Sequence, residues 1–199
     1  MAILDAAERL FAERGFDGAS LGDIGAAAAV SRATPSYFFG GKEQLYAAVL
    51  ERVFAEREAA TAEAFAPLHA WAAGGPGTLE RALTRAIDGY LGFLLARPAF
   101  VALVAREGVE GGARLRAAPR ASSAMADAFA ALRAAGPRRG VRRFDVADAV
   151  LLTISLTFSP LTQRGTFLAA LGRDLDDPAT RRRHVRLAAR QLLHLVEAP

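Results

Sequence analysis

"SLGDIGAAAAVSRATPSYFFGGKEQLY", residues 20–46, is the stretch that decides the fold of this chain. It opens on a capping box, in which the hydroxyl of Ser20 can bond the amide of Asp23 and the carboxylate of Asp23 can reach back. This pattern predicts a short helix that runs to about Ala28, followed by a turn at Ala29 and Val30.

A second short helix is predicted directly after this turn. Its expected cap is Ser31 or Thr34, and it ends near Phe39. Gly40–Gly41 then breaks the chain before a long helix that starts at Lys42. Two short helices joined by a tight turn form a helix-turn-helix, whose second helix enters the major groove of DNA.

A further helix is predicted ahead of this pair, where it can brace it. An apolar stripe marks a helix from about Ile3 to Arg14, and Gly15 supplies its stop. We expect Val30 and Phe38 to fix the pair against this bracing helix.

The pattern stays helical along the rest of the chain, because Ala, Leu and Arg dominate while Gly or Pro recurs between segments. The clearest linker is "AAGGPG", residues 72–77. Later helices are expected over residues 79–96, 98–110, 119–135, 146–159 and 178–196. The sequence therefore predicts an all-α fold of about nine helices.

The charge permits an anionic partner but does not place it. The chain has a net charge of +4, and of its 25 basic residues only Lys42 is a lysine. Residues 1–58 hold six basic and nine acidic side chains, a net of −3, whereas residues 114–143 and 181–190 are rich in arginine. The absence of cysteine excludes disulfides and thiolate metal sites.

Patterns typical of catalysis or metal binding are missing from the sequence. His69, His184 and His194 are far apart, and there is no HExxH, GxGxxG, P-loop or nucleophile elbow. The acidic residues within 174–177 are more typical of a solvated loop than of a calcium site. We therefore expect no enzyme activity, no cofactor and no metal. With no signal-peptide pattern and no apolar run of about 18 residues, we expect a cytoplasmic protein without a membrane partner.

Residues 3–51, "ILDAAERLFAERGFDGASLGDIGAAAAVSRATPSYFFGGKEQLYAAVLE", resemble the DNA-binding domain of the tetracycline-repressor (TetR/AcrR) family of bacterial transcription regulators. The resemblance rests on the order of elements, the capping box, the "VSRAT" opening, the aromatic pair and the "KE" start of the long helix. It implies an N-terminal three-helix helix-turn-helix domain, residues 1–50, which a long fourth helix joins to a helical effector-binding and dimerisation domain, residues 51–199.

The resemblance also implies which residues bind DNA: Ser20, Arg32, Ala33, Thr34, Ser36, Tyr37 and Lys42. Lys42 and Tyr37 are expected to bind phosphates, with the free amides at the start of the long helix beside Lys42. Ser20 and Thr34 are expected to bond phosphate, or in the case of Thr34 the start of its own helix. Arg32, Ala33 and Ser36 are expected to contact base edges.

Three positions depart from the family pattern. Ala29 stands where Gly is usual, Pro35 where Leu or Ile is usual, and Gly41 where Ser or Asn often caps the long helix. The turn must then accept a non-glycine residue. Because proline disfavours α geometry at Thr34, we expect the recognition helix to start later, near Pro35, or to be kinked.

The body of the chain is expected to dimerise and to hold an effector. A dimer is expected because one short helix contacts few bases, while a two-fold pair reads two half-sites. The dimer residues are expected on the last two long helices: Val150, Leu151, Ile154, Val185, Ala188, Leu192 and Leu195. The pocket for a small apolar or aromatic effector is expected to be lined by Phe65, Trp71, Tyr90, Phe93, Phe100, Phe129 and Phe158, with Arg106 and Ser155 as polar anchors.

These observations favour a ligand-responsive DNA-binding regulator, most often a repressor in this family, that binds a palindromic operator as a homodimer. One alternative is a nonspecific or structural nucleic-acid-binding protein acting through the Arg-rich segments "RLRAAPRA" and "GPRRGVRR". A small helical enzyme is a third possibility, for which the sequence offers no set of catalytic residues.

Overall fold

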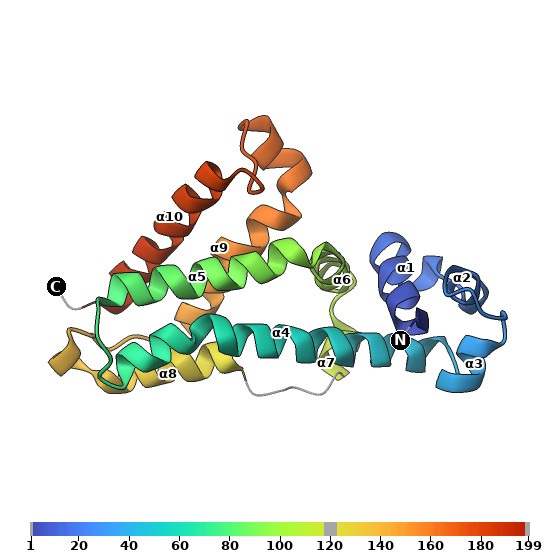
Figure 1. The fold of residues 1–199 in the computed structure, drawn as a ribbon, viewed down its shortest axis with the longest axis horizontal. Helices are drawn as coiled ribbons and strands as arrows, with labels where there is room; N and C mark the ends of the chain where they lie inside the picture. The colour runs from blue at the N-terminus through green and yellow to red at the C-terminus, as the bar shows by residue number, and fades with distance from the viewer. Residues whose placement is uncertain (1, 118–122, 198–199) are drawn as a thin grey trace. The chain divides into compact units, whose positions relative to one another are not determined.

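The computed structural model describes residues 2–117 and 123–197, and within these ranges the regular elements are helices, as the sequence predicts (Figure 1). The α-helices are α1 (Ala2–Gly18), α2 (Leu21–Ala27), α3 (Thr34–Phe39), α4 (Lys42–Ala72), α5 (Leu79–Ala96), α6 (Pro98–Val109), α7 (Ala113–Ala117), α8 (Ala124–Ala135), α9 (Val146–Thr162) and α10 (Pro178–Val196). A 3-10 turn, η1 (Pro137–Arg139), and a π-helical turn, η2 (Arg164–Leu168), lie in the connections on either side of α9.

The predicted helix ends agree closely with the structure where caps mark them. Gly15 has φ 75° and ψ 177°, so regular geometry stops there and a short turn continues to the end of α1. Asp145 and Asp177 accept hydrogen bonds from backbone amides at the starts of α9 and α10. Two differences concern the middle of the chain. The short helix α7 was not predicted. The predicted helix start at Pro119 lies outside the described residues, and α8 begins at Ala124, directly after its cap residue Ser123.

Packing divides the chain into two compact units. Unit 1 comprises residues 1–56 and 97–121, and unit 2 comprises residues 57–96 and 122–199. From the sequence, one boundary is expected at residue 50. The compact units are divided differently, because α6 and α7 pack with the N-terminal helices.

Unit 1 is built on α1, which contacts α2 on one side and α6 on the other. Phe11, Ile24 and Leu45 are fully buried in its core. The first turns of α4 complete this core, since Tyr46 packs edge-on against Phe11 at 4.8 Å between ring centroids.

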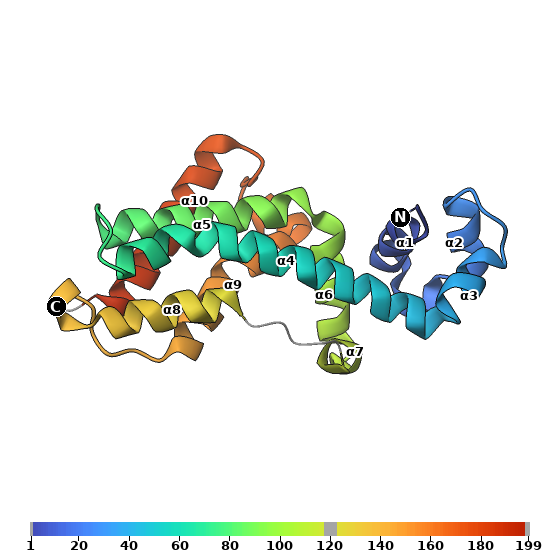
Figure 2. The same cartoon turned by 60° about the horizontal axis from the view of Figure 1, so that its bottom comes forward.

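Unit 2 is a helical bundle in which α5 lies against both α9 and α10, and α8 lies against α9 (Figures 1 and 2). Both views also show α8 running alongside the C-terminal part of α4. The apolar stripe of α5 explains this arrangement, because Leu83, Ile87 and Leu91 are all fully buried. Among the described residues no single helix is long and apolar enough to cross a membrane; α5 and α6 reach that length only as a pair, broken at Arg97.

Candidate nucleic-acid interface

The first helix of the predicted pair, α2, begins with the cap that the sequence indicates. The Oγ of Ser20 accepts a hydrogen bond from the amide of Asp23 at 3.1 Å. The carboxylate of Asp23 reaches the Ser20 hydroxyl, which donates to it at 2.8 Å, and also pairs with Arg14 at 3.5 Å. Ser20 is therefore occupied at the helix start, with its side chain at the exposed edge of α2.

Gly25 allows α2 to approach the following turn closely. A Cβ atom added at Gly25 would lie 2.8 Å from the carbonyl oxygen of Ser31 and 3.2 Å from the Cα of Arg32. Both neighbours are backbone atoms, so no side-chain rotation could relieve the contact. The sequence signal for this position is a glycine inside a short helix, where glycine costs about 0.5–1 kcal/mol relative to alanine.

The turn accepts Ala29 in the left-handed region, at φ 56°. It is the one non-glycine residue with positive φ in the described part of the chain. Left-handed geometry costs a residue with a Cβ about 1–2 kcal/mol, which explains why glycine is the usual choice here. The turn is closed by the amide of Val30, which donates to the carbonyl of Gly25 at 2.9 Å.

The recognition helix begins next to the proline. The structure starts α3 at Thr34, one residue before Pro35, in agreement with the expected start near Pro35. Proline is tolerated in the first helical turn because an amide there has no partner within the helix. The Pro35 ring is buried and packs inward, while the hydroxyls of Ser31 and Thr34 are hydrogen-bonded at 2.7 Å.

Four of the predicted DNA-binding side chains share the exposed surface at α3. Arg32, Ala33, Ser36 and Tyr37 are all exposed, and Tyr37 is 84% exposed. Thr34 is half-buried at the helix start. The structure therefore brings the proposed base-contacting and phosphate-binding residues together on one short helix and the residues just before it.

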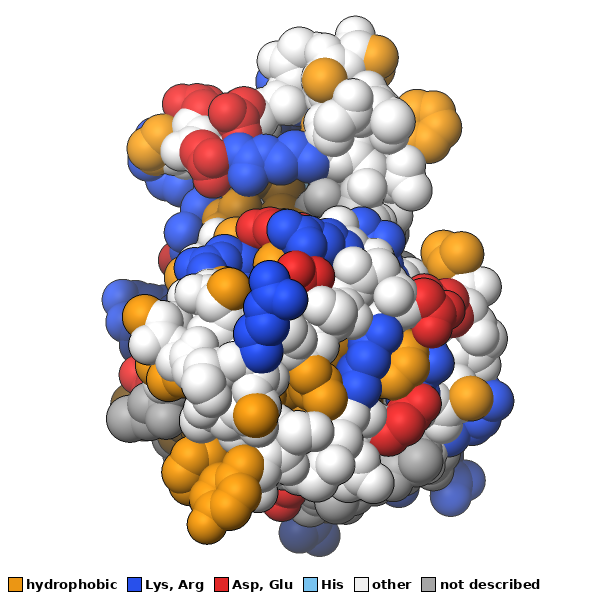
Figure 3. All heavy atoms as spheres, turned by 90° about the vertical axis from the view of Figure 1, so that its right-hand side faces the viewer, with side chains coloured by type: hydrophobic (Ala, Val, Ile, Leu, Met, Phe, Trp, Pro, Cys, Tyr) orange, Lys and Arg blue, Asp and Glu red, His pale blue; other side chains and the backbone are white. Residues whose placement is uncertain are grey.

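Phe38 does not pack inward as expected. It is 67% exposed, and its ring contacts the ring of Tyr37 edge-on at 5.3 Å between centroids. The inward positions of α3 are Pro35 and Phe39, which lie one helical turn apart. Figure 3 faces the end of unit 1 that carries α1 to α3 and shows hydrophobic, basic and acidic side chains intermingled on that surface.

Lys42 is held at the start of α4. Its ammonium lies 4.5 Å from the centroid of the Phe16 ring and donates to the carbonyl of Asp17 at 3.3 Å. Arg114 of α7 lies over the same ring at 4.1 Å. An ammonium has three donors, so the single carbonyl contact leaves Lys42 able to bind a phosphate.

A buried polar contact lies beneath these helices. The phenol of Tyr46 donates to the carboxylate of Glu107 at 2.8 Å, and Glu107 is 1% exposed. Burial raises the pKa of Tyr46 above its usual value, and the hydrogen bond and charge of Glu107 raise it further. Arg114 balances the charge from 3.6 Å. This contact ties α4, α6 and α7 together behind the reading helices.

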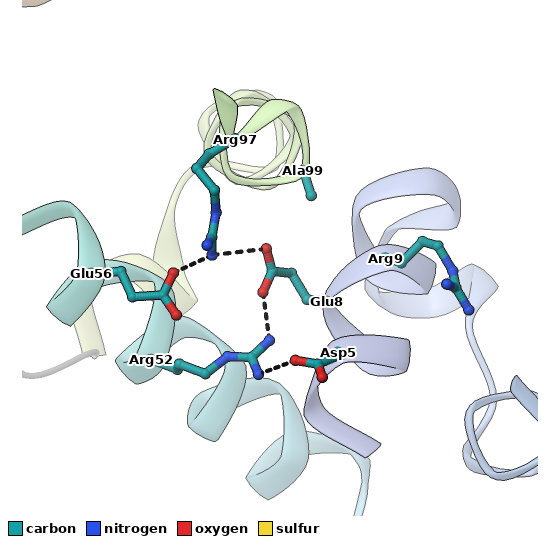
Figure 4. A pocket seen from close by; sticks show the side chains of 7 residues that line it. All are labelled: Asp5, Glu8, Arg9, Arg52, Glu56, Arg97 and Ala99. Atoms are coloured by element: carbon teal, nitrogen blue, oxygen red, sulfur yellow. Dashed lines mark hydrogen bonds and ion pairs between the residues drawn. The ribbon is translucent and has the colours of Figure 1, made fainter. Parts of the chain in front are cut away.

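Ion pairs join α1 to α4 and α6 around a cleft of 270 Å³ (Figure 4). Glu8, which is 8% exposed, pairs with Arg52 at 2.6 Å and with Arg97 at 3.4 Å. Arg52 also pairs with Asp5 at 2.5 Å, and Arg97 pairs with Glu56. Residues 1–56 and 97–121, which make up unit 1, contain ten acidic and ten basic residues in all, so the acidic excess of the N-terminal segment is balanced within the unit.

Two residues of the predicted effector set belong to unit 1. Arg106 donates to the carbonyls of Ala12 and Glu13, at 3.0 and 2.7 Å, where the regular part of α1 ends. This contact ties α6 to the end of the regular part of α1. Phe100 packs edge-on against Phe54 at 5.6 Å.

The other predicted effector residues lie in unit 2, where some form one cluster. The Phe65 ring lies 5.8 Å from Phe129 and 6.3 Å from Tyr90, and Tyr90 stacks on Phe93 at 6.5 Å. Burial raises the pKa of Tyr90. Trp71 lies elsewhere, in the last turn of α4, where Arg139 covers its ring at 4.2 Å. Ser155 is exposed and Phe158 half-buried on α9.

The predicted dimer residues divide into buried and exposed groups. Val185, Ala188 and Leu192 are almost fully buried on the side of α10 that packs within unit 2. Val150 and Leu195 are half-buried, whereas Leu151 and Ile154 on α9 are 64% and 38% exposed. Sequence periodicity did not separate these groups, because both stripes are apolar.

Two arginines of the second Arg-rich segment have structural partners. Arg142 donates to the carbonyls of His194 and Leu195 at the end of α10, and Arg139 donates to those of Trp71 and Gly75. In the acidic loop before α10, Arg164 pairs with Asp174 and Asp176. No cluster of potential metal ligands occurs among the residues that the structure describes.

The short pair α2–α3, braced by α1 and exposing polar side chains from α3, defines a helix-turn-helix DNA-binding protein. Residues 3–49 match the family described as "Bacterial regulatory proteins, tetR family", and residues 80–191 match "Tetracyclin repressor-like, C-terminal domain". The chain belongs to the TetR family. It is a ligand-responsive DNA-binding regulator, and the two alternatives are not favoured.

Comparison with individual proteins agrees with this assignment. The chain is 28% identical over 180 residues to the HTH-type transcriptional repressor NicS of Pseudomonas putida, which covers 88% of this chain and 81% of NicS. A crystal structure of a TetR-family regulator from Haemophilus influenzae has a TM-score of 0.71 at 14% identity, covering 98% of this chain and 94% of the other. A putative transcriptional regulator from Streptomyces coelicolor has a TM-score of 0.68 at 21% identity, covering 100% and 98%. At these identities the structures establish the fold alone.

Proposed function

We propose that this protein is a repressor that binds a palindromic operator as a homodimer in the cytoplasm, and that a small apolar or aromatic effector releases it. In this proposal residues 1–50 read the DNA, and residues 51–199 bind the effector and dimerise. The NicS relative is described as a transcriptional repressor, which supports the same direction of regulation here.

The observation that carries the proposal is the exposed surface of α3. Arg32 and Ser36 supply donors and acceptors for base edges, and Tyr37 supplies a hydroxyl for a phosphate. Lys42 stands three residues beyond the end of α3 and has donors left for a phosphate. A helix of six residues reaches few base pairs, so a second copy is needed for a specific site.

For the dimer we propose the exposed side of α9 and α10. Leu151 and Ile154 project from α9, and Leu187, 53% exposed, projects from α10. Isolated exposed apolar residues are ordinary, but several on two adjacent helices favour burial against a partner. Val185, Ala188 and Leu192 then support the interface from inside by fixing α10 within its own chain.

For the effector we propose the aromatic cluster of unit 2 around Phe65, Tyr90, Phe93 and Phe129. An apolar or aromatic ligand is the chemistry that such a lining favours. The effector acts by binding one conformation more tightly than another, so that the population with correctly spaced reading helices declines.

Footprinting on genomic DNA, or selection from a random duplex pool, tests the proposal. A regulator protects one site with two-fold symmetry, and a matching effector reduces that protection. Protection without sequence preference would instead indicate a nonspecific nucleic-acid-binding protein and would overturn the proposal.

Lys42→Ala is expected to weaken binding to every sequence by a similar factor. Loss of a phosphate contact in each half-site lowers the dependence of log affinity on log salt by about one per site. Fluorescence anisotropy at several salt concentrations measures the affinity of each variant and its dependence on salt. We expect the wild-type slope itself to be shallow for a dimer, because unit 1 has no net charge.

Lys42→Arg is the matched control, because it keeps the charge and should keep the slope. Arg32→Ala should instead change sequence preference at one position of each half-site, by about 1–3 kcal/mol. An equal slope for Lys42→Ala would contradict the assignment of Lys42 to phosphate, and a steep wild-type slope would contradict the expected shallow one.

A further inference from the structure

Phe38 is an apolar side chain in an unusual place. It lies on α3, is 67% exposed, and has no polar atom beyond its backbone. Pro35 is the buried residue of α3 and Phe39 is half-buried, whereas an exposure of 67% leaves Phe38 little part in packing within unit 1. Its exposure therefore calls for a different explanation from that of a core residue.

The Tyr37 ring restricts where the Phe38 ring can go. The two rings meet edge to face at 5.3 Å, with an interplanar angle of 86°. This geometry is a favourable one for aromatic pairs. The phenyl group is thus presented outward from α3, next to the exposed side chains that are proposed to bind DNA.

A phenyl group can recognise only an apolar feature of the groove. Base edges in the major groove present hydrogen-bond donors, acceptors and one apolar group, the C5-methyl of thymine. Arg32 and Ser36 are suited to the polar groups, whereas Phe38 has nothing to offer them. Burial of an exposed ring against a methyl group is favourable because it removes apolar surface of both partners from water.

We propose that Phe38 is a specificity-determining residue that reads the C5-methyl group of a thymine in each half-site. The inference rests on the proposed function, because it requires α3 to enter the major groove. It assigns one base, thymine, and one of its groups, the C5-methyl, to Phe38, whereas Arg32 and Ser36 on the same surface are proposed to recognise bases by hydrogen bonds.

Deoxyuridine substitution tests the inference, since it removes the methyl group and leaves every hydrogen-bonding group of thymine in place. A wild-type operator is first obtained by selection from a random duplex pool. Each thymine is then replaced by deoxyuridine in both half-sites, and affinity is measured for wild type and Phe38→Ala. We expect one symmetric pair of thymines at which wild-type affinity falls about fourfold per methyl group, or roughly 15-fold for the pair.

Phe38→Ala should bind the unmodified operator more weakly and lose its sensitivity at that pair of thymines. Tyr37→Phe is the matched control: it keeps the neighbouring ring, removes only a hydroxyl, and should keep the full sensitivity to deoxyuridine. A general disturbance of α3 would lower affinity without erasing the dependence on one methyl group.

Two outcomes would overturn the inference while the proposed function stood. In one, wild type binds a specific operator but no thymine shows methyl dependence. In the other, the dependence persists in Phe38→Ala, which would assign the methyl contact to another side chain, such as Ala33. Failure to select any operator would instead count against the proposed function.

Discussion

Replacing Gly25 by alanine is expected to remove specific DNA binding almost completely. The new Cβ would meet the carbonyl oxygen of Ser31 at 2.8 Å and the Cα of Arg32 at 3.2 Å, so the backbone before α3 must move away from α2. Overpacking of this kind costs about 1–3 kcal/mol, partly offset by about 0.5–1 kcal/mol from better helix propensity. Because each base contact is worth about 1–3 kcal/mol, loss of one in each half-site costs the dimer about 2–6 kcal/mol, which lowers specific affinity by at least about thirtyfold.

Gly22→Ala is the matched control for this change. It lies in the same helix, but its Cβ would meet only side-chain atoms of Arg32 and Ser20, at 3.8 Å. The helix-propensity gain is the same, so Gly22→Ala should be neutral or slightly stabilising and should bind normally. Affinity is measured by anisotropy on the selected operator, and unfolding by urea. Equal behaviour of the two variants would show that the close approach at Gly25 has no part in reading DNA.

Several helix boundaries could be predicted because local chemistry determines them. The caps at Ser20 and Asp177 fix helix starts within a few residues, and Gly15 fixes a stop. These signals need only hydrogen bonds or dihedral angles of neighbouring residues. The start of the long helix at Lys42, after Gly40–Gly41, was predicted in the same way.

Other features depend on contacts between distant segments, which periodicity does not reveal. Arg106 looked like a polar anchor in an apolar helix, yet its partners are carbonyls some ninety residues earlier in α1. Phe38 looked like core because aromatic residues usually are, but the buried residue of α3 is Pro35, and Phe38 is exposed. The membership of α6 and α7 in unit 1 likewise follows from packing rather than from any linker in the sequence.

Glu8→Ala is expected to cost about 2–3 kcal/mol of unfolding free energy. Glu8 is the nearly buried acid between two arginines, at 2.6 Å from Arg52 and 3.4 Å from Arg97. Removing it leaves both cations short of a partner, and breaking a buried pair typically costs about 3–5 kcal/mol. The arginines keep 24% and 34% side-chain exposure, so water recovers part of that cost. Urea unfolding monitored by circular dichroism measures the change.

Asp5→Ala separates the effect of burial from that of charge. Asp5 pairs with the same Arg52 at 2.5 Å and lies in the same helix, but its side chain is 66% exposed. An exposed pair contributes about 0–1 kcal/mol, so Asp5→Ala should be nearly neutral while Glu8→Ala is not. Arg52 lies in α4 and Arg97 caps the start of α6, so the loss at Glu8 also loosens the support of α1 and should weaken operator binding in parallel with stability (Figure 4). Equal and small losses for both variants would mean that the ion pairs of Glu8 are as solvated as those of Asp5 and do not hold α1 in place.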